Sequence, residues 1–202
     1  MIKRSIRRYV RYIVYLFQWI FCEKIRGLDS TMRDKSLLKK SGGVLHGYSK
    51  TNDKHLMELF DLLSIKSGDS IIDIGCGKGN VLRQAYKYPF DKICGIELDE
   101  RLVSIAKKNF KVLKMEDRIE VLQADALQYD NYANFNHFYF FNPFDEIVMD
   151  KVINNIIQQK NRIVKVIYYN PTCYETIEKY GGKKIHELYD DSKSYATYIY
   201  EL

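Results

Sequence analysis

Short apolar runs alternate with amphipathic stretches from about residue 50 onward, and this alternation constrains the fold more than any other feature. The runs are rich in β-branched and aromatic residues and have the length of buried strands. They lie at 70–74, 92–97, 119–122, 138–141 and 163–169. Apolar runs separated by helical patterns are typical of a parallel sheet with helices on both faces.

Helices are expected before and between these runs. One begins near Thr51 or Asn52, and others cover 80–88, follow Asp99, extend through 147–157, and run from Pro171 to Gly181. Two β-rich runs at 184–189 and 195–200 are joined by a polar turn, which predicts a hairpin. The predicted fold class is α/β: a Rossmann-like, doubly wound, mostly parallel sheet with a C-terminal antiparallel hairpin and an N-terminal amphipathic helix.

A glycine-rich loop follows the first apolar run. It reads Asp73-Ile74-Gly75-Cys76-Gly77-Lys78-Gly79 and opens the next helix. Glycines let the backbone turn sharply and let a ligand approach closely. A dinucleotide-binding loop of the GxGxxG type needs glycine at position 80, where this chain has Asn80. A GxGxG loop with an acidic residue two positions before its first glycine resembles instead the first motif of class I S-adenosylmethionine-dependent methyltransferases.

Polar or glycine residues stand where four of the predicted strands end: Gly75, Glu97, Asp125 and Asn142. In doubly wound sheets, ligands bind beyond the carboxyl ends of the strands. An acidic residue about twenty positions after the glycine loop, such as Glu97, can accept hydrogen bonds from both ribose hydroxyls of a nucleoside. These four positions therefore predict one binding site at one edge of the sheet.

The resemblance implies S-adenosyl-L-methionine as the cofactor and a set of residues that bind it. In the family, Ala124-Asp125-Ala126 corresponds to the element whose carboxylate takes the adenine amino group, and the stretch that includes Tyr48 and Thr51 folds over the methionine end. The implied cofactor-binding residues are Tyr48, Thr51, Asp73, Gly75, Cys76, Gly77, Gly79, Asn80, Glu97, Leu98, Asp125, Ala126 and Asn142.

The sequence Asn142-Pro143-Phe144 resembles the Asn/Asp-Pro-Pro-aromatic element of N-methyltransferases, although only one proline is present. The resemblance implies that these three residues are catalytic and that the acceptor is an amino nitrogen, of a protein lysine or an amide. The other interpretation is a strand-to-helix turn with Pro143 in the first helical position. His137 and Asp145 are the candidates for a general base, if the reaction needs one; the other interpretation is that both are surface groups.

Three further functions stay open. The enzyme could methylate an oxygen of a membrane-associated lipid, a glycan or a small metabolite. From other classes, the chain could be a nucleotide-binding oxidoreductase or a non-catalytic Rossmann-like scaffold. The missing glycine at position 80 argues against the oxidoreductase, and the intact loop with Glu97 argues against the scaffold.

Residues 1–45 form a predicted basic, amphipathic, helical segment, and residues 46–202 the methyltransferase domain. Apolar residues recur every three or four positions in 1–22, among five basic side chains, while the uncharged run 12–22 is too short to cross a bilayer. Two interpretations remain: a helix that packs on the domain, and a helix that lies on an anionic membrane surface.

Charge is distributed unevenly along the chain. Residues 1–50 carry twelve Lys or Arg against three Asp or Glu, whereas the remainder carries twenty basic and twenty-three acidic residues. The domain itself is not basic, which argues against a nucleic-acid partner. The four cysteines are scattered, so neither disulfides nor a metal site are predicted. The predicted location is the cytoplasm, with peripheral attachment to the inner face of the membrane as the alternative; the acceptor and the oligomeric state stay open.

Overall fold

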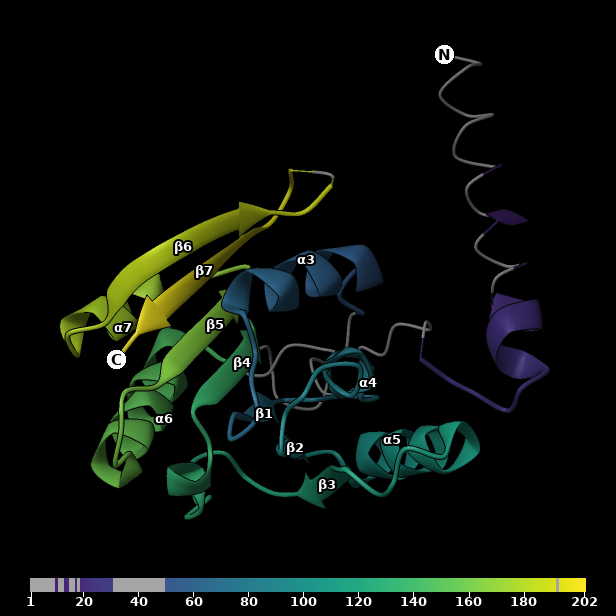
Figure 1. Cartoon of the computed structure of the whole chain (residues 1–202), viewed down its shortest axis with the longest axis horizontal. Coiled ribbons are helices and arrows are strands. Elements are labelled where there is room, and N and C mark those ends of the chain that lie inside the picture. Colours follow the sequence, from purple (N-terminus) through teal and green to yellow (C-terminus); the bar gives the residue numbers. More distant parts are fainter. Residues whose placement is uncertain (1–9, 11–12, 15–16, 18, 31–49, 192) are drawn as a thin grey trace.

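The computed structural model describes residues 10, 13–14, 17, 19–30, 50–191 and 193–202 (Figure 1). Tyr48 and the expected domain boundary at residues 45 and 46 lie outside these ranges, as do nine residues at the N-terminus.

Within the described residues, seven strands form a single sheet in the order β3-β2-β1-β4-β5-β7-β6 (Figure 1). The strands are β1 (Ser70–Ile74), β2 (Lys92–Glu97), β3 (Ile119–Gln123), β4 (His137–Phe141), β5 (Lys165–Tyr169), β6 (Lys183–Tyr189) and β7 (Ala196–Glu201). The first five pair in parallel, β7 runs antiparallel to β5, and β6 antiparallel to β7. The predicted fold class is confirmed for the sheet and its hairpin.

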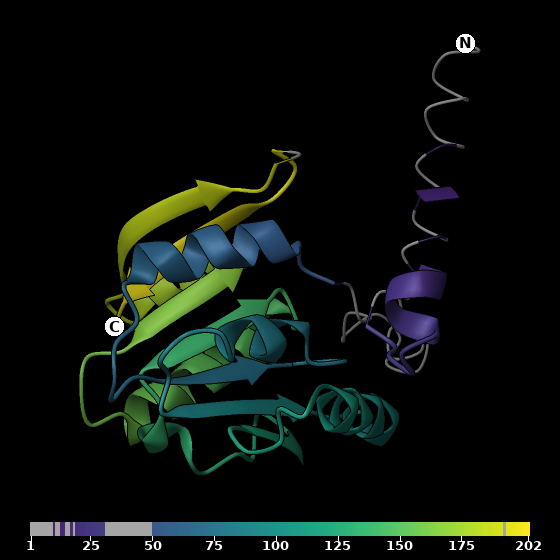
Figure 2. The same ribbon diagram turned by 45° about the vertical axis from the view of Figure 1, so that its right-hand side comes forward.

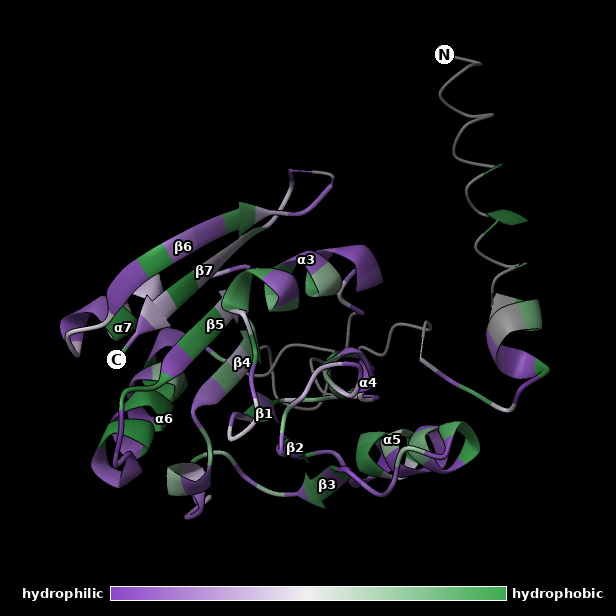
Figure 3. Cartoon of the chain, viewed as in Figure 1, coloured by the Kyte–Doolittle hydropathy of each residue, from purple (hydrophilic) through white to green (hydrophobic). Residues whose placement is uncertain are grey.

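Helices cover both faces of the sheet, as the alternation predicted. They are α3 (Asp53–Leu63), α4 (Asn80–Ala85), α5 (Glu100–Leu113), α6 (Glu146–Gln159) and α7 (Tyr174–Lys179), with a short 3-10 helix at Tyr132–Asn134. Apolar side chains of α3, α4 and α5 pack into one hydrophobic cluster with one face of the sheet, and those of α6 and α7 into a second with the other. Around α5 and α6, hydrophobic and hydrophilic residues alternate, as expected for half-buried helices (Figure 3).

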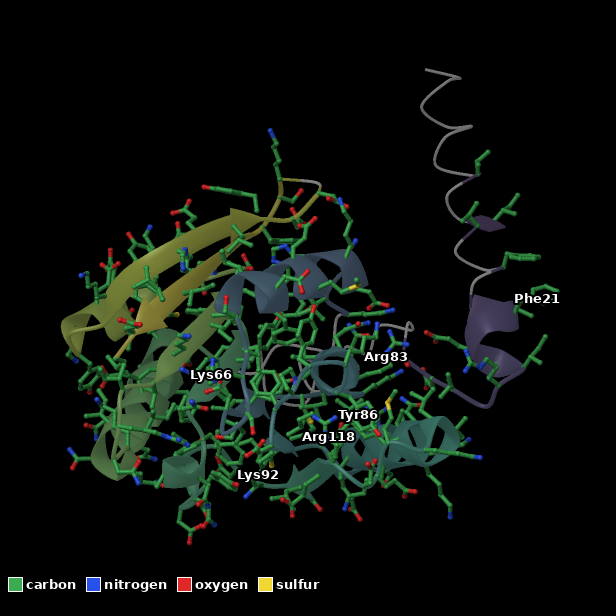
Figure 4. The ribbon with its side chains drawn as sticks, viewed as in Figure 1. Phe21, Lys66, Arg83, Tyr86, Lys92 and Arg118 are labelled. Atoms are coloured by element: carbon green, nitrogen blue, oxygen red, sulfur yellow. The ribbon has the colours of Figure 1, made fainter. Side chains whose placement is uncertain are left out.

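Two helices differ from their predicted bounds. Helix α4 ends at Ala85, three residues early, because the amides of Lys87 and Tyr88 bond to the carbonyls three residues before them, those of Gln84 and Ala85, which tightens the chain into turns. The Arg118 guanidinium donates to the main-chain oxygens of Tyr86, Tyr88 and Phe90 (3.2, 2.9 and 2.7 Å) and holds these turns. Figure 4 shows Arg118 beside Tyr86, whose ring it also covers. Helix α7 begins at Tyr174, not at Pro171, because the chain first makes a tight turn in which the Thr172 amide bonds to the Asn170 carbonyl (2.9 Å), with Asn170 at a left-handed φ of 53°.

The N-terminal segment lies to one side of the sheet (Figure 2). Its described part contains a π-helix, η1 (Trp19–Lys24), and then turns at Gly27 toward the domain. In the part of the chain that the structure describes, every helix is too short or too polar to span a bilayer.

Candidate functional site

The parallel registers bring the predicted strand-end residues to one edge of the sheet. Ile74 of β1 pairs with Ile96 of β2 and with Phe140 of β4, and Glu97 pairs with Gln123 of β3. The residues that follow these positions therefore leave the sheet together. Gly75, Glu97, Asp125 and Asn142 all lie at this carboxyl edge.

The glycine loop wraps around the end of β2. The amides of Gly75 and Cys76 both donate to the carbonyl of Ile96, at 2.9 and 3.0 Å. Gly75, Gly77 and Gly79 all have positive φ (81°, 54° and 85°), a conformation that L side chains rarely adopt. The Cys76 side chain points inward and is 4% exposed, packed against Gly95 of β2. Only the backbone of Cys76 is therefore placed to reach a ligand.

The Glu97 carboxylate ties this loop to the loop before α5. One oxygen accepts the Gly77 amide and the other accepts the Asp99 amide, both at 3.0 Å. Burial raises the pKa of Glu97, and the amides of Asp99, Gly77 and Leu98 partly offset this effect. Each carboxylate oxygen retains acceptor capacity after one bond. The next side chain, Leu98, is 48% exposed, so an apolar surface adjoins these acceptors.

Asp73 is a second buried acid beside the loop. Its side chain is 3% exposed, and among the described residues no hydrogen bond to its carboxylate is present. Burial raises its pKa well above the usual range, and repulsion from Glu97 adds to this. A buried carboxyl group held in this way costs stability, which is typical of a residue retained for function.

Thr51 and Asn80 join the segment before α3 to α4. The Asn80 amide group donates to the carbonyl of Thr51 (2.9 Å), and the hydroxyls of Thr51 and Tyr139 share a hydrogen bond (3.1 Å). Thr51 is 2% exposed and Asn80 3%. Arg83, labelled in Figure 4, strengthens this junction by donating to Asp53 and Asn80. The polar groups of Thr51 and Asn80 thus have protein partners.

Tyr139 was missed by the sequence reasoning. It is fully buried in the middle of β4, where its hydroxyl needs a hydrogen-bond partner, which Thr51 supplies. A tyrosine within an otherwise phenylalanine-rich strand is the signal that was available.

Asp125 and Ala126 follow β3 at the same edge. Asp125 is half-buried and accepts the amide of Leu127 at 2.9 Å, which is a turn-capping contact. Ala126 is 7% exposed, and its carbonyl accepts the hydroxyl of Tyr132 at 2.8 Å. The position of Asp125 suits the predicted contact with adenine, and that role stays a prediction.

Asn142 adopts a left-handed conformation (φ 38°) directly after β4. Its amide oxygen accepts the hydroxyls of Thr172 (2.6 Å) and Tyr168 (3.2 Å). Pro143 lies against the glycine loop, where a side chain on Gly75 would come within 3.1 Å of it. The catalytic role of this element stays a prediction, and Phe144 is 9% exposed within the cluster beneath α6.

Thr172 and Tyr168 are further residues that the sequence reasoning missed. The available signal was a repeat: Asn170-Pro171 follows β5 as Asn142-Pro143 follows β4, and both asparagines have positive φ. The two turns lie at the ends of adjacent strands, so the second turn supplies the hydroxyls that hold the first.

Of the two candidate bases, His137 lies far from the candidate site and Asp145 serves as the cap of a helix. His137 begins β4, so it is at the opposite end of the strand from Asn142, and burial lowers its pKa to about 4. The suggestion that it acts as a base near the site was wrong. Asp145 caps α6 by accepting the amide of Val148 (2.9 Å). Within the described residues, no cluster of three or more His, Cys, Asp or Glu side chains is arranged to hold a metal ion.

Comparisons with known proteins agree with this architecture. Residues 65–199 match the family model of a methyltransferase domain. The rRNA N(6)-adenosine-methyltransferase metl-5 of Caenorhabditis elegans is 34% identical over 73 residues, which are 36% of this chain and 34% of that protein. The ribosomal protein L11 methyltransferase of Thermotoga neapolitana is 32% identical over 97 residues, 48% of this chain and 36% of that protein. The matches thus span about a third of these relatives.

Solved structures share the fold at low sequence identity. An RNA methyltransferase from Salinibacter ruber, in complex with S-adenosyl-L-homocysteine, has a TM-score of 0.60 at 19% identity and covers 75% of this chain and 92% of that one. The m1A22 tRNA methyltransferase TrmK of Bacillus subtilis has a TM-score of 0.62 at 17% identity, with 75% and 66% covered.

The family match extends from just before β1 almost to the end of β7, which is more than half of the chain. It includes the glycine loop and every strand-end position described above. The chain therefore belongs to the class I, Rossmann-like S-adenosylmethionine-dependent methyltransferases.

Proposed function

We propose that the carboxyl edge of the sheet binds S-adenosylmethionine and that the enzyme transfers its methyl group to an amino nitrogen. The observation that carries the cofactor site is the position of Glu97, which reaches the glycine loop through Gly77 and retains acceptor capacity on both oxygens. In this proposal, Glu97 holds the ribose hydroxyls, Asp125 the adenine amino group, and Leu98 packs against the adenine.

The chemistry of the acid residues fits this cofactor. Its ribose, adenine and ammonium groups are hydrogen-bond donors, and its sulfonium carries a positive charge. Three carboxyl groups, those of Asp73, Glu97 and Asp125, lie at this edge of the sheet. Asp73 has no hydrogen-bond partner among the described residues, which suits a role toward a cationic ligand. Glycines at 75, 77 and 79 leave the loop without side chains, so a ligand can approach its backbone.

The bound cofactor supplies a methyl group on an activated sulfur, ready for direct in-line displacement. The protein therefore has to align the acceptor and exclude water, and a catalytic triad is not needed. Their position supports a role of Asn142 and Pro143 in this alignment, because they leave β4 beside the glycine loop. We assign them the acceptor side of the site, with Phe144 as the buried support beneath them.

The amino acceptor is supported by the Asn142-Pro143-Phe144 element and by the names of two relatives, which methylate an adenosine of rRNA and a ribosomal protein. Both hydroxyl contacts to Asn142 use its amide oxygen, so an amino group has to displace one of them. The exposed Thr172 is the easier of the two to displace. The sequence analysis argued against a nucleic-acid partner, and these relatives do not support that expectation.

A membrane contact is proposed for the N-terminal segment. Seven apolar residues of this segment, all before residue 26, are 42–68% exposed: Val10, Ile13, Val14, Phe17, Ile20, Phe21 and Ile25. Figure 4 shows Phe21 on η1, away from the sheet, and its ring lies 4.3 Å from that of Phe17. Five basic residues precede or accompany this surface in the sequence, and each contributes about 1 kcal/mol near an anionic bilayer. Residues 1–22 are thus the proposed docking segment for the inner face of a membrane.

Replacing Glu97 tests the cofactor site. Glu97→Gln keeps the size of the side chain but removes the charge that the ribose hydroxyls bond to. Bonds of this kind contribute about 1.5–3 kcal/mol each, so the Kd for S-adenosylhomocysteine should rise at least about tenfold in isothermal titration calorimetry. Glu120→Gln, an exposed glutamate on neighbouring β3, is the matched control and should leave the Kd unchanged. Equal affinity of Glu97→Gln and wild type would remove Glu97 from the site.

Replacing Asp73 tests whether this residue lowers the stability of the ligand-free protein and contributes to cofactor binding. The pKa of Asp73 is raised in the folded protein, so ionisation of Asp73 lowers the free energy of unfolding. This cost is absent below the ordinary pKa near 4 and is complete once the pH has risen through the folded-state pKa. Asp73→Asn should therefore raise the Tm of the ligand-free protein by several degrees at pH 7.5. This gain in Tm should shrink toward pH 4. At pH 7.5 the variant should also bind S-adenosylmethionine more weakly than the wild type. The exposed Asp130→Asn is the control, and an unchanged Tm for Asp73→Asn at pH 7.5 contradicts the interpretation.

The acceptor is tested by following label from tritiated S-adenosylmethionine into cell fractions incubated with the enzyme. Label recovered in N-methylated amino acids or N-methylated nucleobases after complete hydrolysis of the protein or RNA, and lost in Asn142→Ala, supports an amino nitrogen. Label recovered in O-methyl groups of a lipid, glycan or small metabolite supports the O-methyltransferase alternative and contradicts the amino assignment.

Deletion of residues 1–22 tests the membrane contact. The full chain should sediment with vesicles that contain phosphatidylglycerol and remain in the supernatant with pure phosphatidylcholine. The deletion should remove sedimentation and leave the calorimetric Kd for S-adenosylhomocysteine unchanged, because the contacts of residues 23–30 with the domain are preserved. Sedimentation of the shortened protein would show that the segment is not the membrane contact.

A further inference from the structure

The segment from Glu23 to Ser30 is docked on the domain. Leu28 and Ser30 are each 4% exposed. Glu23 closes the segment on itself, because its carbonyl accepts the amide of Leu28 (2.9 Å) and its carboxylate accepts the amide of Ser30 (3.0 Å). Asp29 is thereby held between two buried neighbours.

Asp29 connects this segment to the glycine loop and to α5. The ammonium group of Lys78, which lies between Gly77 and Gly79, donates to the Asp29 carboxylate at 2.6 Å. Asn109 of α5 accepts the Asp29 amide (2.9 Å) and donates both to the Asp29 carbonyl (2.9 Å) and to the Lys78 carbonyl (3.2 Å). Asp29, Lys78 and Asn109 therefore form one connected polar cluster, which we call the Asp29 latch.

The latch holds the part of the loop that β2 does not reach. Ile96 and Glu97 hold the amides of Gly75, Cys76 and Gly77, whereas Lys78 bonds to Asp29 and Asn109. The Lys78 side chain is 4% exposed and that of Asp29 44%, so the ammonium group is buried and depends on charged and polar partners. A loop with three left-handed glycines has high conformational freedom, and contacts at both ends reduce it.

We propose that Asp29 is a positioning residue for the cofactor: acting through Lys78 and Asn109, it preorganises the glycine loop in the conformation that binds S-adenosylmethionine. This inference rests on the proposed cofactor site. Preorganisation raises affinity because less conformational entropy is lost on binding. Residues 23–30 consequently belong to the cofactor-binding unit, although Ser30 lies 43 positions before Asp73, where the glycine loop begins.

A double-mutant cycle on cofactor affinity tests the latch in the full-length protein. Asp29→Asn and Lys78→Met should each raise the Kd for S-adenosylhomocysteine about 5- to 10-fold, and the double variant should be no weaker than the weaker single variant, because both act through one contact. The control is Asp150→Asn, which removes an ion pair of similar length (2.7 Å to Lys179) between α6 and α7 and should leave the Kd unchanged.

A purely structural role gives a different result. It would lower the Tm of Asp29→Asn but leave the Kd within twofold of wild type at a temperature well below the transition, which overturns the proposal; additive effects in the cycle overturn it as well. Asp29→Glu, which keeps the charge, should retain more affinity than Asp29→Asn. If Asp29→Asn does not fold, Lys78→Met tests the latch by itself, and an unchanged Kd of that variant overturns the proposal. Failure of the wild type to bind S-adenosylhomocysteine would refute the cofactor site instead. Amide exchange of residues 75–79 in the ligand-free protein still tests the latch in that case: Asp29→Asn should accelerate it, and unchanged exchange counts against the latch.

Discussion

The contact between the Glu97 carboxylate and the amides of Gly77 and Asp99 is the constraint on which the candidate site depends. It joins the loop after β1 to the loop after β2, so the two segments that would enclose an adenosine are held at one spacing. A carboxylate can do this and still accept further bonds, because each oxygen has two lone pairs. The same residue therefore organises the glycine loop and retains acceptor capacity, which the proposed cofactor site requires.

This arrangement has a cost in stability. Asp73 and Glu97 are both buried acids with raised pKa, and they repel each other when ionised. The buried ammonium of Lys78 is compensated by Asp29, which lies in a segment outside the sheet. Charge burial of this kind is expensive unless partners are present. Near the glycine loop, burial raises the pKa of two acids, Asp73 and Glu97. At the opposite edge of the sheet, burial instead lowers the pKa of His137.

Much of the fold was predictable because strand and helix periodicities are local properties. The strands were predicted with small errors at their ends, as for β5, which begins at Lys165 and not at residue 163. The end of α4 was not predictable, because the turns that follow it are held by Arg118, which lies 28 to 30 residues along the chain and donates to the carbonyls of Tyr88 and Phe90. The error over His137 had a similar cause: proximity in sequence to Asn142 does not imply proximity in space, since a strand separates the two residues.

The sequence alone determined the class of fold, the glycine loop and the strand ends at which Glu97, Asp125 and Asn142 would lie, because these follow from residue type and spacing along the chain. Tertiary structure decided which polar groups meet. The contacts of Thr51 with Tyr139, of Asn142 with Thr172, and of Asp29 with Lys78 join residues 30 to 88 positions apart. Such pairs form only when the sheet and its covering helices bring separate segments together, because the partners are far apart in the sequence.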